Sequence, residues 1–318
     1  LISELFQSSP ITMDAGQIYV NPIPENLSKD TTAITFTNKF GEFKMSKITD
    51  TNSPKFNNWR LNSPRELPAR IHTIFQIFET LKEITVRKLH QFEPINISGF
   101  SLDNPLIKIQ IQTPQENIDI SFGLINPIDN SAYMMVSNHQ TIYQIENIKF
   151  PLETYNLSNF IESRVFITNV SEISEFTLYQ GKVSARPLLM LRQENGKWMS
   201  AKGVELDKEK VEDYLNRVLN IRSQVILDKR DDELQKKIDK ELASPQFTVV
   251  INRMGKEIEY VLSSPIRALP DYKIENRKSF ILSASDEEQP YVIKRESLDI
   301  FNVRERDLAA PNVKKFFY

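Results

Sequence analysis

Apolar and polar residues alternate in four stretches of the chain, and the alternation predicts strands. The stretches are Ile107–Ile111, Ile118–Phe122, Phe247–Ile251 and Ile258–Leu262. A period of two is typical of half-buried antiparallel strands. The short links around Gln115–Asn117 and Met254–Lys256 predict hairpin turns. The second pair of strands follows the first at an offset of 140 residues.

A stripe of apolar residues at helical spacing precedes each predicted hairpin. The first stripe is Ile71, Ile74, Phe75, Phe78 and Leu81, and the same offset leads to Val211, Tyr214, Leu215, Val218 and Ile221. Pro68 suits the first turn of the first helix, and Asp207 is a suitable N-cap for the second. A third helix is expected over residues 229–243, where the alternating charges indicate a solvated face.

The constant offset predicts a tandem duplication of one α+β unit. Six residues mark the repeat: Trp59 and Trp198, Pro105 and Pro245, and Arg164 and Arg306. The two tryptophans each end a strand-like run, and the two arginines are expected to pair with carboxylates that close the sheets. We expect an extended segment or linker at 1–30 and repeats at 31–168 and 169–318. Each repeat would be a mainly antiparallel sheet with one long helix packed on a face.

Composition narrows the class of function. The apolar fraction of 40% and charged fraction of 26% are those of a globular protein. A formal net charge of −2 argues against a nucleic-acid partner. The absence of cysteine excludes disulfides and thiolate sites, and the eight glycines form no phosphate-binding loop.

Side chains that could carry chemistry are few and scattered. The three histidines, His72, His90 and His139, are interpreted as structural or surface residues, since Gln76 completes no metal pair with His72. Glu79 and Glu83 indicate a solvated helix face, and 231–233 lacks the spacing of a calcium loop. We therefore expect no catalytic, cofactor-binding or metal-binding residue, and we predict that the chain is not an enzyme. The terminal residues 313–318 are expected to pack on the core.

Several structural motifs resemble those of one bacterial family. They are Trp59-Arg60-Leu61 followed by Pro64, the helix Ile71–Leu81, Gly99-Phe100 followed by Pro105, and the strand end Ile120–Gly123. Together they resemble the domain of unknown function 4340 family, whose members are encoded beside gliding-type ABC transporters. The second half departs from the pattern, since Ser200–Gly203 replaces the proline link and Leu242–Pro245 keeps only the proline.

The resemblance implies a non-catalytic accessory subunit on the periplasmic side of the bacterial inner membrane. It implies a membrane tether upstream of Leu1, and ABC permease and ATPase subunits as partners. The tandem sheets are expected to offer long edges for these partners. The alternative hypothesis is a periplasmic binding module for a cell-envelope glycan or a lipid-derived ligand. In that case Tyr133, Tyr143 and Tyr291 are the candidates for stacking on sugars.

Overall fold

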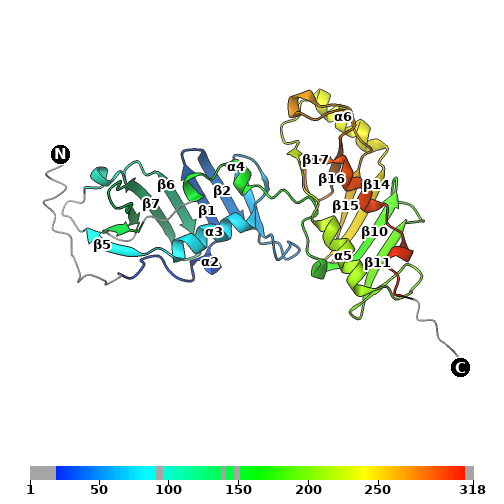
Figure 1. Cartoon of the computed structure of the whole chain (residues 1–318), viewed down its shortest axis with the longest axis horizontal. Coiled ribbons are helices and arrows are strands. Elements are labelled where there is room, and N and C mark those ends of the chain that lie inside the picture. Colours follow the sequence, from blue (N-terminus) through cyan, green and yellow to red (C-terminus); the bar gives the residue numbers. More distant parts are fainter. Residues whose placement is uncertain (1–18, 91–95, 138–139, 147–150, 312–318) are drawn as a thin grey trace. The chain divides into compact units, whose positions relative to one another are not determined.

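The chain folds into two compact units, shown in Figure 1. The computed structural model describes residues 19–90, 96–137, 140–146 and 151–311. Within these ranges, unit 1 takes its residues from Leu1–Thr49 and Asn58–Glu162, and unit 2 from Asp50–Asn57 and Ser163–Tyr318. The sequence placed the boundary after residue 168, whereas the structure places Ser163 and the following residues in unit 2.

The described residues of unit 1 form a nine-stranded antiparallel sheet with the order β4-β3-β2-β1-β6-β7-β8-β9-β5. The strands are β1 (Ala33–Asn38), β2 (Gly41–Lys47), β3 (Trp59–Ser63), β4 (Leu67–Pro68), β5 (Val86–His90), β6 (Ile107–Gln112), β7 (Asn117–Ile125), β8 (Ala132–Val136) and β9 (Ile142–Ile145). Strands β6 and β7 are the predicted hairpin, and their alternating isoleucines are buried. The predicted alternation is therefore confirmed here.

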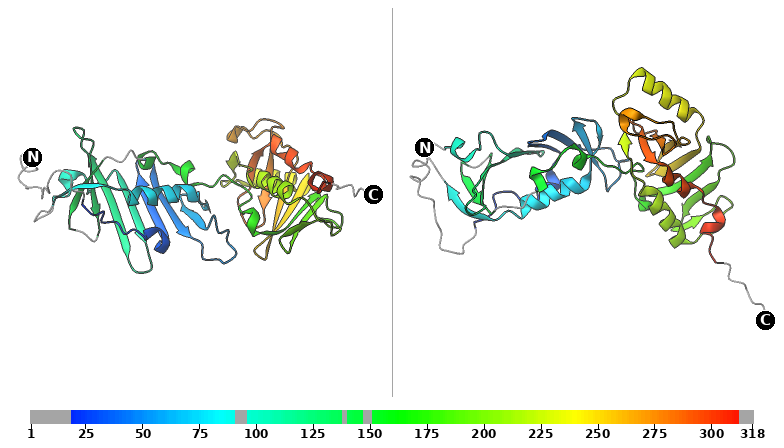
Figure 2. Two further views of the ribbon diagram at one scale, coloured as in Figure 1. Left: turned by 60° about the horizontal axis from the view of Figure 1, so that its bottom comes forward. Right: turned by 45° about the horizontal axis from the view of Figure 1, so that its top comes forward.

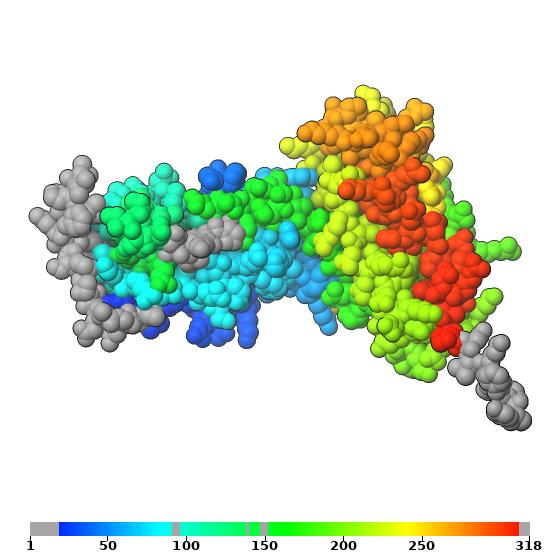
Figure 3. Space-filling view, viewed as in Figure 1, coloured from blue at the N-terminus to red at the C-terminus, as the bar shows by residue number. Residues whose placement is uncertain are grey.

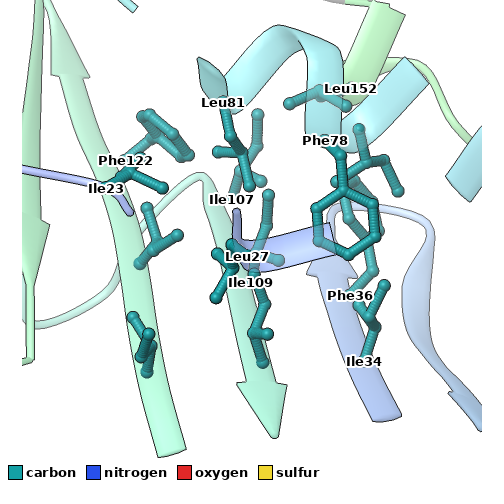
Figure 4. Packing of buried hydrophobic residues seen from close by; sticks show 14 of the residues in the cluster. Ile23, Leu27, Ile34, Phe36, Phe78, Leu81, Ile107, Ile109, Phe122 and Leu152 are labelled. Atoms are coloured by element: carbon teal, nitrogen blue, oxygen red, sulfur yellow. The ribbon is translucent and has the colours of Figure 1, made fainter. Parts of the chain in front are cut away.

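Helix α3 (Ile71–Lys82) lies across one face of this sheet, as Figure 2 shows. Its buried residues include Ile74, Ile77, Phe78 and Leu81. Phe78 and Leu81 lie over apolar residues of β1 and β6 in Figure 4. The prediction for Phe75 was wrong, because this side chain is 54% exposed and Ile77 is buried in its place.

The start of α3 also differs from the expectation. Pro68 belongs to β4, and the helix begins three residues later, after Arg70 as its N-cap. The other short helical segments of unit 1 are α2 (Leu27–Asp30), α4 (Leu157–Phe160), η1 (Ser98–Phe100) and η2 (Pro151–Glu153).

The described part of residues 1–30 packs within unit 1. Tyr19 pairs with Val86 at the edge strand β5, and Ile23 and Leu27 are buried in the core. The Asn21 amide donates to the carbonyl of Leu81 at 2.9 Å, near the end of α3. Residues 19–30 are thus part of the unit.

The described residues of unit 2 form an eight-stranded antiparallel sheet with the order β12-β11-β10-β14-β15-β16-β17-β13. The strands are β10 (Ile173–Gln180), β11 (Leu189–Glu194), β12 (Lys197–Met199), β13 (Val225–Ile226), β14 (Phe247–Arg253), β15 (Lys256–Leu262), β16 (Ser279–Ala284) and β17 (Tyr291–Lys294). Strands β14 and β15 confirm the second predicted hairpin, whose turn places Met254 and Gly255 at positive φ.

Unit 2 contains two twelve-residue helices, α5 (Lys208–Leu219) and α6 (Asp232–Ala243). The expectation of one long helix per unit therefore does not hold for unit 2, although the sequence did predict both helices. Asp207 caps α5 as expected by accepting from the Lys210 N–H at 3.0 Å. Shorter turns are η3 (Val170–Glu172), η4 (Pro270–Tyr272), η5 (Arg295–Phe301) and η6 (Glu305–Leu308).

The two helices of unit 2 pack on opposite faces of its sheet. Phe176 on β10 packs edge-on against Tyr214 of α5, and the cross-strand registers place Leu282 on that same face. Because side chains alternate along a strand, Ile281 points to the other face. Ile281 there joins the cluster that contains Ile238 of α6.

The strand orders of the two sheets match from β3 and β12 onward, with β4 additional in unit 1. In unit 1 the Ala69 N–H donates to the Trp59 carbonyl, and in unit 2 Leu206 donates to Trp198. The residue after each donor is the helix N-cap. These parallels support the predicted duplication. The tryptophans, however, do not end their strands: Trp59 is the first residue of β3, and Trp198 is the middle residue of β12.

Candidate functional site

The six repeat markers occupy structural positions. Trp59 and Trp198 are 3% and 1% exposed, so each belongs to the interior of its own unit. Pro105 and Pro245 are half-buried, and each comes two residues before an inner strand. A proline suits this position, since it lies outside the hydrogen-bonded ladder.

The two arginines do not occupy equivalent positions. Arg164 lies in unit 2, where it donates to the carbonyls of Leu219 and Thr168 and stacks over the Phe56 ring at 4.6 Å. Arg306 lies on η6 with a side chain that is 87% exposed. Its ion pair is with the neighbouring Asp307 at 4.0 Å, a contact that contributes little at an exposed site.

The residues considered for acid–base or metal chemistry are not gathered into one place. His72 is exposed, and the His90 ring lies 3.1 Å from the Gln144 side-chain oxygen. His139 and residues 313–318 lie outside the described residues. Glu79 on α3 and Glu83, the C-cap of that helix, are exposed, and Asp231 caps α6 by accepting from the Leu234 N–H at 2.7 Å. Among the described residues, no group of three or more histidines and carboxylates is arranged to hold a metal ion.

The tyrosines proposed for sugar stacking are poorly placed for it. Tyr143 and Tyr291 are only 7% and 1% exposed. Tyr133 is half-buried and packs against Phe100 with ring centres 4.7 Å apart. Burial raises the pKa of the Tyr133 and Tyr143 hydroxyls above the usual value for tyrosine. Their rings fill the protein interior rather than a sugar-binding surface.

Two of the sequence motifs meet on the face of the unit 1 sheet. The turn at η1 places Phe100 and Leu102 against Ile142 in a small apolar cluster. A side-chain carbon added at Gly123 of β7 would lie 2.1 Å from the Phe100 carbonyl oxygen and 3.0 Å from the Leu102 side chain. Gly123 is thus needed for close approach of this turn to the sheet.

A cleft in unit 2 is the best-formed candidate site. It has a volume of about 570 Å³ and lies between α6 and residues 265–278, which form the yellow and orange regions beside each other in Figure 3. Residues 265–278 fold back as a narrow loop, since the N–H groups of Ile266 and Arg277 donate to the carbonyls of Ser279 and Ile266. At the tip, Leu269 and Ile274 pair on either side of η4.

The floor of this α6 cleft is apolar. Ile238, Ile266 and Ile281 are at most 2% exposed and belong to one cluster, with the half-buried Leu234 and Leu269 packed against it. Ile238 comes from the helix, Ile266 from the loop and Ile281 from β16. The floor is therefore built from a helix, a loop and the strand that follows the loop.

The rim of the α6 cleft carries a positive charge. Lys237, Lys240, Arg267 and Arg277 line it together with a single carboxylate, Glu241. Lys237 pairs with Glu233 at 3.0 Å, and the Arg277 guanidinium donates to the Pro265 carbonyl. Within the described part of the chain, Lys240 and Arg267 make no ion pair. Positive charge thus exceeds negative charge around an apolar floor.

Comparison with known protein families shows the family of this chain. A family model described as a domain of unknown function (DUF4340) matches residues 59–240, more than half of the chain. The chain belongs to this family. No curated protein and no solved structure matches it significantly. The DUF4340 match begins at β3 of unit 1 and ends within α6 of unit 2.

The α6 cleft of this DUF4340 chain was missed from the sequence. Lys237 and Lys240 were interpreted as part of a solvated helix face, and residues 265–278, which contain Arg267 and Arg277, carried no periodic pattern. The one available signal was the stripe of Leu234, Ile238 and Leu242, which requires a covering partner.

The described residues also contain no helix with the length and apolar character needed to cross a membrane.

Proposed function

We propose that this DUF4340 chain is a non-catalytic, membrane-tethered module on the periplasmic side of the bacterial inner membrane. It binds the permease and ATPase-containing core of a gliding-type ABC transport complex as an accessory subunit. The motifs around Trp59, Gly99 and Gly123 resemble those of envelope proteins. We include the membrane tether and the periplasmic location in the proposal because of this resemblance.

The extent of the family match is the observation that carries this proposal. The match extends from β3 to α6, so the region common to the family includes parts of both sheets and the chain between them. A match that spans two units supports a scaffold that presents surfaces to other proteins.

The exposed side chain of Phe75 is the one to test for partner binding. It lies on α3 inside the matched region and is 54% exposed, with the exposed polar residues His72, Gln76 and Glu79 around it. Large aromatic side chains surrounded by polar residues are the common anchors of protein interfaces. We therefore expect Phe75 to contact a partner subunit.

The test is affinity purification of the full-length protein from gently solubilised native membranes, followed by mass spectrometry. We expect a permease and an ATPase in stoichiometric amounts. Phe75→Ala should reduce their recovery without lowering the melting temperature, because little buried surface is lost. Phe40→Ala is the matched control, since Phe40 is 52% exposed at a different site, in the β1–β2 turn. Recovery of the wild-type protein alone would overturn the proposal.

A second candidate function is the binding of a small ligand from the cell envelope. The glycan version loses its support because Tyr143 and Tyr291 are buried. The lipid-derived version is favoured by one observation, the apolar floor and cationic rim of the α6 cleft.

A further inference from the structure

We infer that the α6 cleft binds a single-chain amphiphile with an anionic head, either a carboxylate or a phosphate. The apolar tail lies on the floor made by Ile238, Ile266 and Ile281, and the head lies between Lys240 and Arg267. This inference does not depend on the binding of transporter subunits, because it concerns the isolated chain and a small molecule.

The polarity of the cleft gives the direction of the ligand. One end is formed by the root of the 265–278 loop and the second half of α6, where three cations, Lys240, Arg267 and Arg277, outnumber the one carboxylate, Glu241. A second pocket, which shares Leu234 and Leu269 with the cleft, lies towards the loop tip. Its charged lining has three carboxylates and two lysines: Asp231, Glu233, Asp271, Lys229 and Lys237. Cations attract an anionic head group and carboxylates repel it, so we place the head at the root end of the cleft.

The composition of the cleft selects an amphiphile over a purely polar anion. A free phosphate or a small carboxylate would gain only charge contacts with exposed cations, which water screens. Burying an alkyl tail on the apolar floor adds hydrophobic stabilisation that grows with chain length. Both parts of the ligand are therefore needed for stable binding.

The size of the cleft favours a small molecule over a protein segment. Its volume of about 570 Å³ falls within the range of roughly 300–1,000 Å³ found for ligand sites. A protein partner needs a contact of about 800 Å² on each side. The lining of the cleft is confined to one helix, one loop and one strand residue, Ile281.

The test uses calorimetric titration of the full chain below the critical micelle concentrations of the probes. The probes are laurate, dodecyl phosphate, dodecyl maltoside and inorganic phosphate. We expect binding of laurate or dodecyl phosphate, and the preference between them identifies the head group. Equal binding of the uncharged dodecyl maltoside would overturn the role of the cations, and equal binding of inorganic phosphate would overturn the role of the tail.

Paired charge reversals locate the head group. Lys240→Glu combined with Arg267→Glu should weaken binding of the anionic probe by about tenfold or more. The matched control is Lys236→Glu with Lys278→Glu, which makes the same change in net charge at exposed positions outside the lining. Equal weakening by both pairs would refute the site.

A variant that blocks the cleft tests the site independently of the charge variants, which could fail to fold. Ala268 is exposed at the rim, so Ala268→Trp should fill the cleft without disturbing the core and should abolish binding. Unchanged binding would contradict the inference. Binding to phosphatidylglycerol vesicles in the absence of any binding to monomeric laurate or dodecyl phosphate would replace it with a membrane-surface contact.

Discussion

Gly123 shows how a single residue permits the packing of a whole turn. It lies within β7, and the Phe100 carbonyl oxygen occupies the space that a side chain would need. Its φ is outside the left-handed region, so close approach rather than backbone conformation excludes other residues. The obstacle is a backbone atom, which cannot rotate away as the end of a flexible side chain can.

Gly123→Ala is therefore expected to lower the stability of unit 1 by about 1–3 kcal/mol through overpacking. Gly203→Ala provides the comparison, because no atom lies within 4 Å of its added carbon but its φ of 73° still disfavours alanine. That variant should lose only about 1 kcal/mol. Calorimetric melting of both variants measures the difference. A smaller loss at Gly123 than at Gly203 would contradict the steric account.

At the scale of elements, the two equivalent helices begin differently. The N-cap Asp207 of α5 accepts a hydrogen bond from the Lys210 N–H, whereas the N-cap of α3 is Arg70, which makes no side-chain cap. Both N-cap residues donate their own N–H to a carbonyl of the terminal segment of their unit, Phe160 or Leu308. The backbone geometry at Arg70 is extended, as a capping residue requires.

Arg70→Asp should consequently stabilise unit 1 by about 1 kcal/mol, since an N-cap carboxylate accepts from a first-turn N–H, as Asp207 does in α5, and interacts favourably with the helix dipole. Arg70→Ala is the control, because it removes the guanidinium without supplying an acceptor. An equal melting temperature for the aspartate and alanine variants would show that capping is not the limiting factor at this terminus.

Local patterns predicted the inner strands and both amphipathic helices. The alternating isoleucines of β6 and β7 predicted strands, because both strands bury one face in the core that they share with α3. The short strands β4 and β13 were not predictable, since two residues carry no period and their pairing is set by distant partners. Phe75 fitted the helical stripe but lies on its exposed side, which spacing alone does not distinguish from Ile77.

The candidate site was less predictable than the fold. The α6 cleft unites a helix with residues 265–278, and only the tertiary structure brings Lys240 beside Arg267 and Arg277. In the sequence each of these cations has charged or polar neighbours like those of any surface residue. A binding site made of common residue types therefore leaves no local signal.

At the scale of the whole molecule, the sheet edges are short. The outermost strands of unit 1 are β4, with two residues, and β5, with five, and Tyr19 bridges to Val86 of β5. In unit 2 they are β12, with three residues, and β13, with two. The expectation of long edges for partner contacts was wrong. Short edges are a common protection against unwanted strand pairing, so we expect the proposed partner contact on helix and loop surfaces.

The placement of one buried tryptophan in each unit gives the molecule two optical probes. Trp59→Phe leaves the fluorescence of Trp198 alone to report on unit 2, and Trp198→Phe leaves Trp59 to report on unit 1. The second substitution loses no hydrogen bond within the described residues, because the buried Trp198 Nε1 has no partner among them. When Gly123→Ala is added to each variant, the urea midpoint seen by Trp59 should fall further than that seen by Trp198. Equal shifts would mean that the two units unfold as one.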